Sequence, residues 1–241
     1  MKKFLFFSIM AIYAFLSCTE DTDVIVDERT ENYRLYDYYV DSNGNEGIVC
    51  YADTSNSSNK TIIVISADEA YLSWGPLNDA VFREDSVTED MQANPSFGLS
   101  MLQIMTLKGI NHYPAMNWCA EKNPQDVAPN SSCWRLPTRS ELAAIFGYEK
   151  YAVLKKHSNL SKLNEALKDI GATLMQENNY YWTCNENFDT CMSSNGKDNR
   201  KDLAVPMTIN NVSMMDKELC LKKNKYYVRA IKYIYYKKSI G

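Results

Sequence analysis

The chain has 241 residues, of which 45% are hydrophobic and 23% are charged, and its formal net charge at pH 7 is −4. The apolar content is ordinary for a globular protein, and the length suits one large domain or two small ones. The net acidity argues against nucleic acid as a partner, because such partners require a basic surface.

The first seventeen residues have the pattern of a signal peptide. Lys2 and Lys3 form a positive start, and an apolar stretch interrupted only by Ser8 follows over Phe4–Leu16. This stretch suits the hydrophobic part of a signal peptide and is too short for a membrane-spanning helix, which needs roughly 20 apolar residues. We therefore predict that residues 1–17 are removed on export.

A small residue, Ser17, precedes Cys18, and the sequence then becomes abruptly polar at Thr19–Asp23. This resembles a bacterial lipobox, in which the cysteine receives a diacylglycerol, although Phe15 stands where the lipobox usually has leucine. Each buried CH₂ contributes about 0.8 kcal/mol, so several lipid chains on one cysteine would hold the protein on a bilayer. The alternative is ordinary signal-peptidase cleavage near Ala14 or Ser17.

Residues 18–32 are acidic, low in apolar content and without periodicity, which indicates a flexible tether. The acidic start resembles export signals that send lipoproteins to the outer face. We expect an outer-membrane lipoprotein exposed at the cell surface, with the periplasmic face as the alternative. Residues 33–241 are predicted to form a single domain.

The domain is predicted to begin with strands. Tyr36–Val40 and Gly47–Tyr51 flank a turn-rich segment and predict a hairpin. The β-branched run Thr61–Ser66 predicts a buried strand. Leu72–Pro95 predicts a loop with at most one short helix.

Helices are predicted in the middle of the chain. Ser100–Leu107 is apolar and suits the start of a helix, and Pro114–Ala120 suits a short helix because proline is favoured at the first position. Thr138 and Glu141 form a capping-box pattern ahead of an apolar face. A further helix is predicted to end at Gly171. Its apolar face comprises Leu160, Leu163, Leu167 and Ile170.

Strands return in the last third of the chain. Tyr180–Cys184, Leu203–Ile209 and Tyr226–Tyr236 are rich in aromatic and β-branched residues and predict strands. Between them, Asn185–Asp202 is rich in Asn, Asp and Ser and predicts a long polar loop.

Seven cysteines occur, and six remain for pairing if Cys18 is lipidated. An even set in an exported chain fits disulfides. We predict a Cys184–Cys191 bridge, which would close a small loop, and a Cys119–Cys133 bridge, which would close a loop of about 15 residues and stabilise the fold by roughly 3 kcal/mol. The alternative is that some are buried free thiols, which pack as small apolar groups.

The sequence lacks the patterns of the common catalytic and metal sites. The two histidines, His112 and His157, lie in separate segments, and no His-x-x-x-His or Cys-x-x-Cys spacing occurs. Phosphate-binding glycine loops and the Gly-x-Ser-x-Gly motif are also absent. We therefore expect no metal, no cofactor and no enzymatic activity.

The order of three motifs resembles the Lcl C-terminal domain family, a bacterial family formerly described as a domain of unknown function. The motifs are Cys133–Leu142 (CWRLPTRSEL), Tyr181–Thr183 (YWT) and Val228–Ile231 (VRAI), and the resemblance spans about residues 35–236. It implies an α+β, C-type-lectin-like fold with small antiparallel sheets, two to three helices, paired N- and C-terminal strands and a long loop that faces the ligand. Structural roles are expected for Trp134, Arg135, Leu136, Pro137, Thr138, Glu141 and Arg229.

The calcium-binding triplets of sugar-binding C-type lectins are absent, so the polar loop is interpreted as solvated although its oxygen atoms would suit calcium. The leading hypothesis is a non-catalytic binding or adhesion module for a glycan or protein ligand. The alternatives are an accessory subunit of a surface appendage or transport complex, and an enzyme related to formylglycine-generating enzymes. The candidate ligand-binding residues are Tyr181, Trp182, Asn185, Glu186, Asn187, Asp189, Asn195, Asp198 and Asn199.

Overall fold

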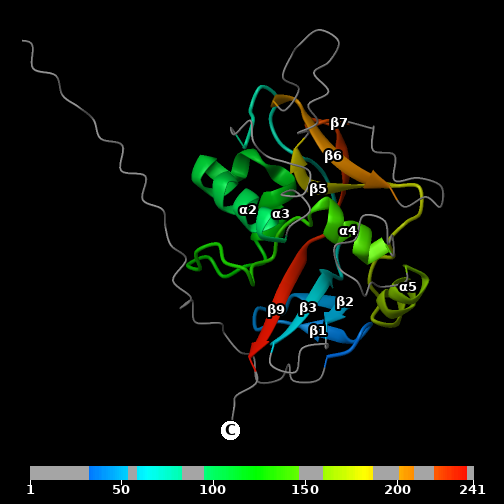
Figure 1. Ribbon diagram of the computed structural model, residues 1–241. Helices are drawn as coiled ribbons and strands as arrows, with labels where there is room; N and C mark the ends of the chain where they lie inside the picture. Colours follow the sequence, from blue (N-terminus) through cyan, green and yellow to red (C-terminus); the bar gives the residue numbers. More distant parts are fainter. Residues whose placement is uncertain are drawn as a thin grey trace, which may run out of the picture.

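The computed structural model of the protein describes residues 33–53, 59–82, 95–146, 160–186, 201–208 and 220–237. These ranges form a mixed α+β fold with two small sheets, four α-helices and one 3₁₀ helix (Figure 1). The predicted α+β class is thereby confirmed. The predicted signal peptide, the predicted lipidation site Cys18 and the tether lie outside the described residues. Within the described ranges, no helix is both long enough and apolar enough to cross a bilayer.

The first sheet joins the two ends of the described chain. Its strands, in spatial order, are β1 (Tyr38–Val40), β2 (Glu46–Asp53), β3 (Asn59–Ser66) and β9 (Ile231–Lys237), and every neighbouring pair is antiparallel. The predicted hairpin and the predicted buried strand are therefore confirmed.

The turn of the β1–β2 hairpin is organised by Asp41. One oxygen of its carboxylate accepts the backbone N–H groups of Asn43 and Asn45, each at 2.9 Å, and Gly44 takes the positive φ of 79° that the turn requires. The other oxygen accepts the indole N–H of Trp134 at 2.8 Å. The same aspartate thus forms the turn and ties it to the buried Trp134 of the Cys133–Leu142 motif, whose residues 134–138 we call the WRLPT motif.

The second sheet has the order β4-β8-β5-β6-β7. All its neighbouring strands are antiparallel except β5 and β8, which are parallel and meet at Tyr181 and Tyr227. The strands are β4 (Ala70–Ser73), β5 (Tyr180–Glu186), β6 (Leu203–Thr208), β7 (Cys220–Leu221) and β8 (Lys225–Val228). Strand β4 covers the beginning of a segment that the sequence predicted to be a loop, so this part of the prediction is wrong.

The single strand predicted over Tyr226–Tyr236 is two strands, β8 and β9, in different sheets. The break falls at Arg229 and Ala230. The guanidinium of Arg229 is buried and donates to the carbonyl oxygens of Ser66 and Ala67, at 2.8 and 3.1 Å. These bonds hold the chain against the end of β3 and redirect it from the second sheet into the first.

Some of the helices begin or end at residues with clear local signals. Helix α3 (Pro114–Ala120) has proline at its start, and α2 (Pro95–Gly109) extends the predicted Ser100–Leu107 segment in both directions. Gly171 follows α5 (Leu160–Asp169) with a φ of 71°, and its N–H donates to the Lys168 carbonyl. The remaining helices are η2 (Ile110–His112) and α4 (Arg139–Phe146).

Two hydrophobic cores lie on opposite faces of the sheets. Figure 1 shows α2 and α3 on one side of the molecule and α5 on the other. Along β3, Ile62 and Val64 pack into the core under α2 and α3, whereas Ile63 and Ile65 pack into the core under α4 and α5. Successive side chains of a strand point to opposite faces. A continuous apolar run without polar alternation, such as the one in β3, therefore indicates a strand whose two faces are both covered.

Candidate functional site

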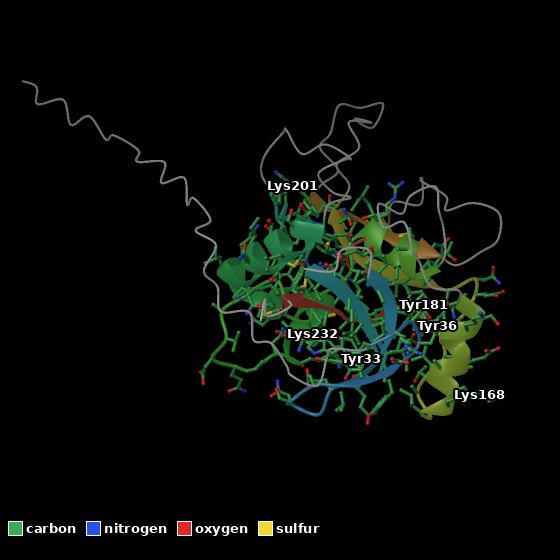
Figure 2. The ribbon with its side chains drawn as sticks, turned by 60° about the horizontal axis from the view of Figure 1, so that its bottom comes forward. Tyr33, Tyr36, Lys168, Tyr181, Lys201 and Lys232 are labelled. Carbon is green, nitrogen blue, oxygen red and sulfur yellow. The ribbon has the colours of Figure 1, made fainter. Side chains whose placement is uncertain are left out.

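The ligand-binding residues predicted at the base of the polar loop are buried. Tyr181 is 1% exposed, and Trp182, Asn185 and Glu186 are each 0% exposed. Tyr181 packs in the core under α4 and α5, while Trp182 packs in the core under α2 and α3. In Figure 2 Tyr181 lies within the body of the domain, whereas Lys168 at the end of α5 points outward. Neither ring of these two predicted ligand-binding residues faces solvent, because both faces of β5 are covered.

The two polar candidates next to these rings have structural partners. Asn185 accepts the backbone N–H of Arg139 at 2.8 Å and so caps the start of α4 from a distant strand. Glu186 accepts the backbone N–H groups of Val81 and Phe82 and pairs with Lys222. The remaining predicted loop residues lie outside the described ranges: Asn187, Asp189, Asn195, Asp198 and Asn199.

The WRLPT motif and Glu141 form an internal brace, which contains the predicted capping box. The buried guanidinium of Arg135 donates from two nitrogens to the carboxylate of Glu141, at 2.7 and 2.8 Å. Glu141 also accepts the backbone N–H of Thr138 and the hydroxyl of Tyr233, each at 2.7 Å. In return, the Thr138 hydroxyl accepts the Glu141 N–H at 3.2 Å, which completes the capping box.

All seven residues for which a structural role was predicted are buried. Pro137 also accepts the backbone N–H of Cys184 at 2.8 Å, which joins the motif to β5. The Arg229 guanidinium lies 3.1 Å from the Glu69 carboxylate. The buried set is Trp134, Arg135, Leu136, Pro137, Thr138, Glu141 and Arg229.

The predicted bridge between Cys119 and Cys133 is not formed, and both residues are free buried thiols. Cys184, the predicted partner of Cys191, is likewise a free thiol, and Cys191 lies outside the described residues. All three thiols pack in the core under α2 and α3 as small apolar groups, and burial raises the pKa of each. Because the thiolate is the nucleophile, these thiols are poorly suited to covalent chemistry.

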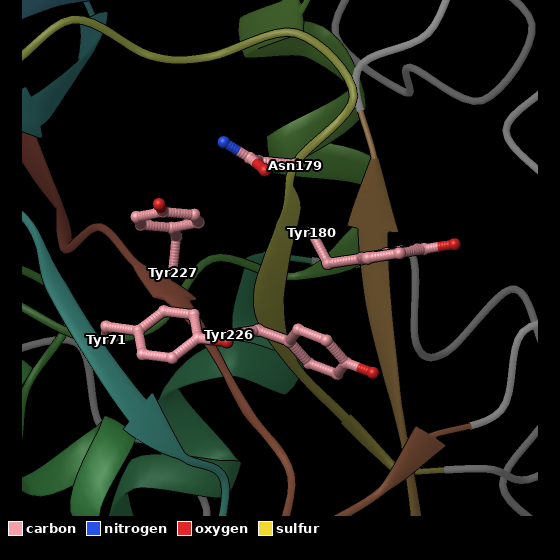
Figure 3. A pocket seen from close by; sticks show the side chains of 5 residues that line it. All are labelled: Tyr71, Asn179, Tyr180, Tyr226 and Tyr227. Atoms are coloured by element: carbon pink, nitrogen blue, oxygen red, sulfur yellow. The ribbon is translucent and has the colours of Figure 1, made fainter.

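A pocket of about 290 Å³ opens on the second sheet where β4, β8 and the beginning of β5 meet (Figure 3). Its lining contains four tyrosines and one asparagine, and we call it the tyrosine pocket. The lining residues are Tyr71, Asn179, Tyr180, Tyr226 and Tyr227.

The rings of the pocket form two contacting pairs. Tyr71 and Tyr227 are direct cross-strand neighbours with ring centroids 5.2 Å apart and planes at 61°. Tyr180 and Tyr226 also have centroids 5.2 Å apart, with planes at 49°. Tyr71 is 54% exposed, and the other lining residues are partly buried. The pocket therefore offers aromatic faces, phenol hydroxyls and one carboxamide, and its described lining carries no formal charge.

The sequence analysis missed this pocket because its residues come from three separate segments. Tyr71 lies just before a segment predicted to be a loop, and the others lie in or beside two predicted strands. One signal was present. The adjacent pairs Tyr180–Tyr181 and Tyr226–Tyr227 each place one tyrosine on either face of a strand. One tyrosine of such a pair can pack in a core while the other lines the surface of the sheet.

The described residues contain no cluster of three or more His, Cys, Asp or Glu side chains that could hold a metal ion. Comparison of the chain with models of protein families, with curated proteins and with solved structures found no match. The resemblance to the Lcl C-terminal domain family therefore rests on the sequence motifs alone.

Proposed function

We propose that the chain is a non-catalytic binding or adhesion module, anchored by a lipid on Cys18 and displayed at the surface of the outer membrane. In this proposal a C-type-lectin-like domain presents the tyrosine pocket to a glycan or protein ligand. The pairing of β9 with β3, which brings the chain end back to the first sheet, supports that fold. The polar loop that begins after β5 is the second candidate surface of the same module.

The tyrosine pocket is the observation that carries the proposal. Tyrosine combines a large apolar face with a hydroxyl that donates and accepts hydrogen bonds, which suits recognition more than bond cleavage. The buried WRLPT brace favours a rigid scaffold for such a site, because Arg135 and Glu141 form an ion pair with each other. The buried thiols with raised pKa weigh against the alternative of a cysteine-dependent enzyme.

A binding screen tests the function itself. The full-length lipidated protein, held in detergent, is applied to arrays of glycans and of surface proteins, with heat-unfolded protein as the control. We expect a ligand that binds the folded protein alone. Binding of the folded and unfolded forms to the same spots would contradict the proposal, and absence of any ligand would favour an accessory subunit.

Two variants locate the surface that binds. Replacing residues 187–199 with a short Gly-Ser turn removes most of the polar loop, and Tyr71→Ala opens the tyrosine pocket. We expect Tyr71→Ala to weaken binding to the array ligand while the loop replacement leaves it unchanged. The opposite result would assign the ligand to the polar loop and leave the module function intact.

The anchor is tested separately by mass spectrometry of the membrane-extracted protein. We expect a diacylglycerol on Cys18 and a released or unprocessed form for Cys18→Ala. An unmodified Cys18 in the membrane fraction would contradict lipidation. Protease added to intact cells should digest the domain, whereas complete protection would place it on the periplasmic face.

A further inference from the structure

We propose that the tyrosine pocket binds a single neutral sugar ring, and that it does so without calcium. This inference rests on the proposed function, which leaves the ligand open between a glycan and a protein. It concerns the pocket alone and not the polar loop.

The lining determines the charge of the ligand. The polar groups of the pocket are four phenol hydroxyls and the carboxamide of Asn179, which are groups able both to donate and to accept hydrogen bonds. The Tyr226 hydroxyl donates to Cys220 Sγ at 3.2 Å and the Asn179 carboxamide donates to Gln176 Oε1 at 2.8 Å, so these two groups offer a ligand their acceptor atoms first. Sugar hydroxyls have the same dual capacity. An acidic or sulfated sugar would leave water without an opposite charge in the described lining, and a charge taken from water without a partner is costly. A quaternary ammonium ion is attracted to aromatic faces, but its methyl groups cannot use the hydroxyls of the lining. The lining therefore favours an uncharged, hydroxyl-bearing ligand.

The rings determine its shape. The planes of Tyr71 and Tyr227 meet at 61°, so the two rings form a corner and not one flat wall. A saturated six-membered ring can place its C–H face on one tyrosine and its edge on the other. Tyr71 leaves half of its surface to solvent for such a contact. A flat or extended ligand would contact only one of the two rings.

The size of the pocket restricts the ligand to about one sugar unit. Small-molecule pockets range from about 300 to 1,000 Å³, and this one has about 290 Å³. A longer glycan would therefore place one residue inside and extend the rest into solvent.

The walls of the pocket are held in place from behind. Tyr227 packs against buried Tyr181 at 5.5 Å, and Tyr226 packs against buried Trp182 at 4.8 Å between ring centroids. The indole N–H of Trp182 in turn donates to the Leu72 carbonyl at 2.9 Å, which ties β5 to β4. Rings already fixed in this way lose little conformational entropy when a ligand binds.

The described lining of this pocket lacks the carboxylates that a calcium site needs. Calcium requires six to eight oxygen ligands, with carboxylates among them, and no Asp or Glu belongs to the described lining. Binding at the tyrosine pocket should therefore persist in a chelator. This property separates the pocket from the oxygen-rich segment between β5 and β6, which the sequence predicts to be a loop and whose composition would suit a calcium-dependent site.

The test uses the full-length lipidated protein in a detergent whose head group is not a sugar. The probes are methyl glycosides of neutral hexoses and of N-acetylhexosamines, and binding is followed by saturation-transfer NMR in the presence of EDTA. We expect transfer to the ring C–H protons of at least one probe. Tyr71→Ala should lower the affinity for that probe by about tenfold, which corresponds to about 1.4 kcal/mol of binding free energy. Tyr71→Phe, which keeps the ring, should bind nearly as well as the wild type.

Tyr38→Ala is the matched control. Tyr38 is 43% exposed on β1, a short edge strand of the other sheet, and it lies outside the pocket lining. We expect this variant to bind the sugar as the wild type does. Thermal unfolding of each variant separates loss of the pocket from loss of the fold. If Tyr71→Ala unfolds early, Asn179→Ala gives the second measurement, and it should weaken binding without moving the unfolding midpoint.

Four results would overturn the inference: no transfer to any neutral sugar, loss of binding in EDTA, equal binding by Tyr71→Ala and Tyr38→Ala, or binding of tetramethylammonium in place of sugars. The last result would identify an aromatic cage for cations. An array ligand that is unaffected by Tyr71→Ala would also overturn the inference but would leave the proposed function standing. A folded protein that binds neither array ligands nor these glycosides would overturn both.

Discussion

Two buried ion pairs stabilise a buried carboxylate to different degrees. Arg135 and Glu141 lie beside the first sheet. Glu186 ends β5 of the second sheet, and Lys222 directly follows β7. The charged ends of both pairs are removed from solvent. Burial alone would raise the pKa of Glu141, but the charge of Arg135 and the hydrogen bonds to this carboxylate hold its pKa below the ordinary value. Burial also raises the pKa of Glu186, and there the charge of Lys222 does not offset it.

The difference lies in the donors that surround each carboxylate. Glu141 receives two parallel bonds from a planar guanidinium, one hydroxyl and one backbone N–H. Glu186 receives two backbone N–H groups and a single ammonium nitrogen, and the pKa of Lys222 is itself lowered by burial. Guanidinium is delocalised, weakly hydrated and matched to a carboxylate in two places, whereas ammonium is a strongly hydrated point charge. Equal burial therefore leaves the pKa of Glu141 lowered in one pair and the pKa of Glu186 raised in the other.

The largest effect is expected for Glu141→Gln. This substitution leaves the Arg135 charge buried without its counter-charge, and breaking a buried pair from one side costs about 3–5 kcal/mol. Chemical denaturation should show this loss in the free energy of unfolding. Glu165→Gln, at an exposed position of α5, is the control and should change the free energy by less than about 0.5 kcal/mol. A loss below about 1 kcal/mol for Glu141→Gln would mean that the brace contributes little.

A smaller effect is expected for Lys222→Met, about 1–3 kcal/mol. The carboxyl that remains, Glu186, already has a raised pKa and can take up a proton in place of its lost partner. Denaturation at neutral pH measures the cost. A loss as large as that of Glu141→Gln would remove the distinction between the two pairs.

The pairs should also respond to pH in opposite directions. The raised pKa of Glu186 means that its contribution is most favourable below the unfolded value of about 4.3 and declines as the pH rises through the folded value. The lowered pKa of Glu141 means that its contribution is present above about 4.3 and is lost as the pH falls through the folded value.

Denaturation midpoints measured from pH 7 down to about pH 3 test these directions. Compared with Glu186→Gln, the wild type should gain stability as the pH falls from 7 toward about 4.3. Compared with Glu141→Gln, it should lose stability below about 4.3. Parallel curves for the wild type and Glu186→Gln would show that Glu186 does not titrate differently in the folded protein.

The smallest effect is expected for Thr138→Ala, about 1 kcal/mol. The substitution removes the hydroxyl that accepts the Glu141 N–H but leaves the ion pair in place. Thr173→Ala, at an exposed position before β5, should be close to neutral. A cost near that of Glu141→Gln would indicate that the cap and the ion pair act as one unit.

The sequence predicted the contacts between residues that are close together in the chain. Thr138 and Glu141 have capping-box spacing, so the cap at the start of α4 was predicted, and a structural role was expected for Arg135 in the same motif. The first hairpin, the proline at the start of α3 and Gly171 after α5 were predicted for the same reason. Each depends on contacts between residues a few positions apart, which the residue types alone specify.

Contacts between distant segments were decided by the tertiary structure. Glu186 and Lys222 are 36 residues apart, and no spacing rule brings them together. The alternation along β5 correctly separates Tyr181 from Trp182, but it does not reveal that helices cover both faces of the sheet and bury both rings. Cys119 and Cys133 have the spacing of a bridged loop, yet they pack as separate thiols under α2 and α3.

The tyrosine pocket shows the same division between local pattern and tertiary placement. The strand pattern predicts that Tyr180 and Tyr226 lie in strands, and the sequence by itself determines no more about them. Only the pairing of β8 with both β4 and β5 brings them beside Tyr71, which is more than a hundred residues earlier than Tyr180. Side-chain alternation is a property of one strand, whereas the neighbours of that strand are chosen by the packing of the whole domain.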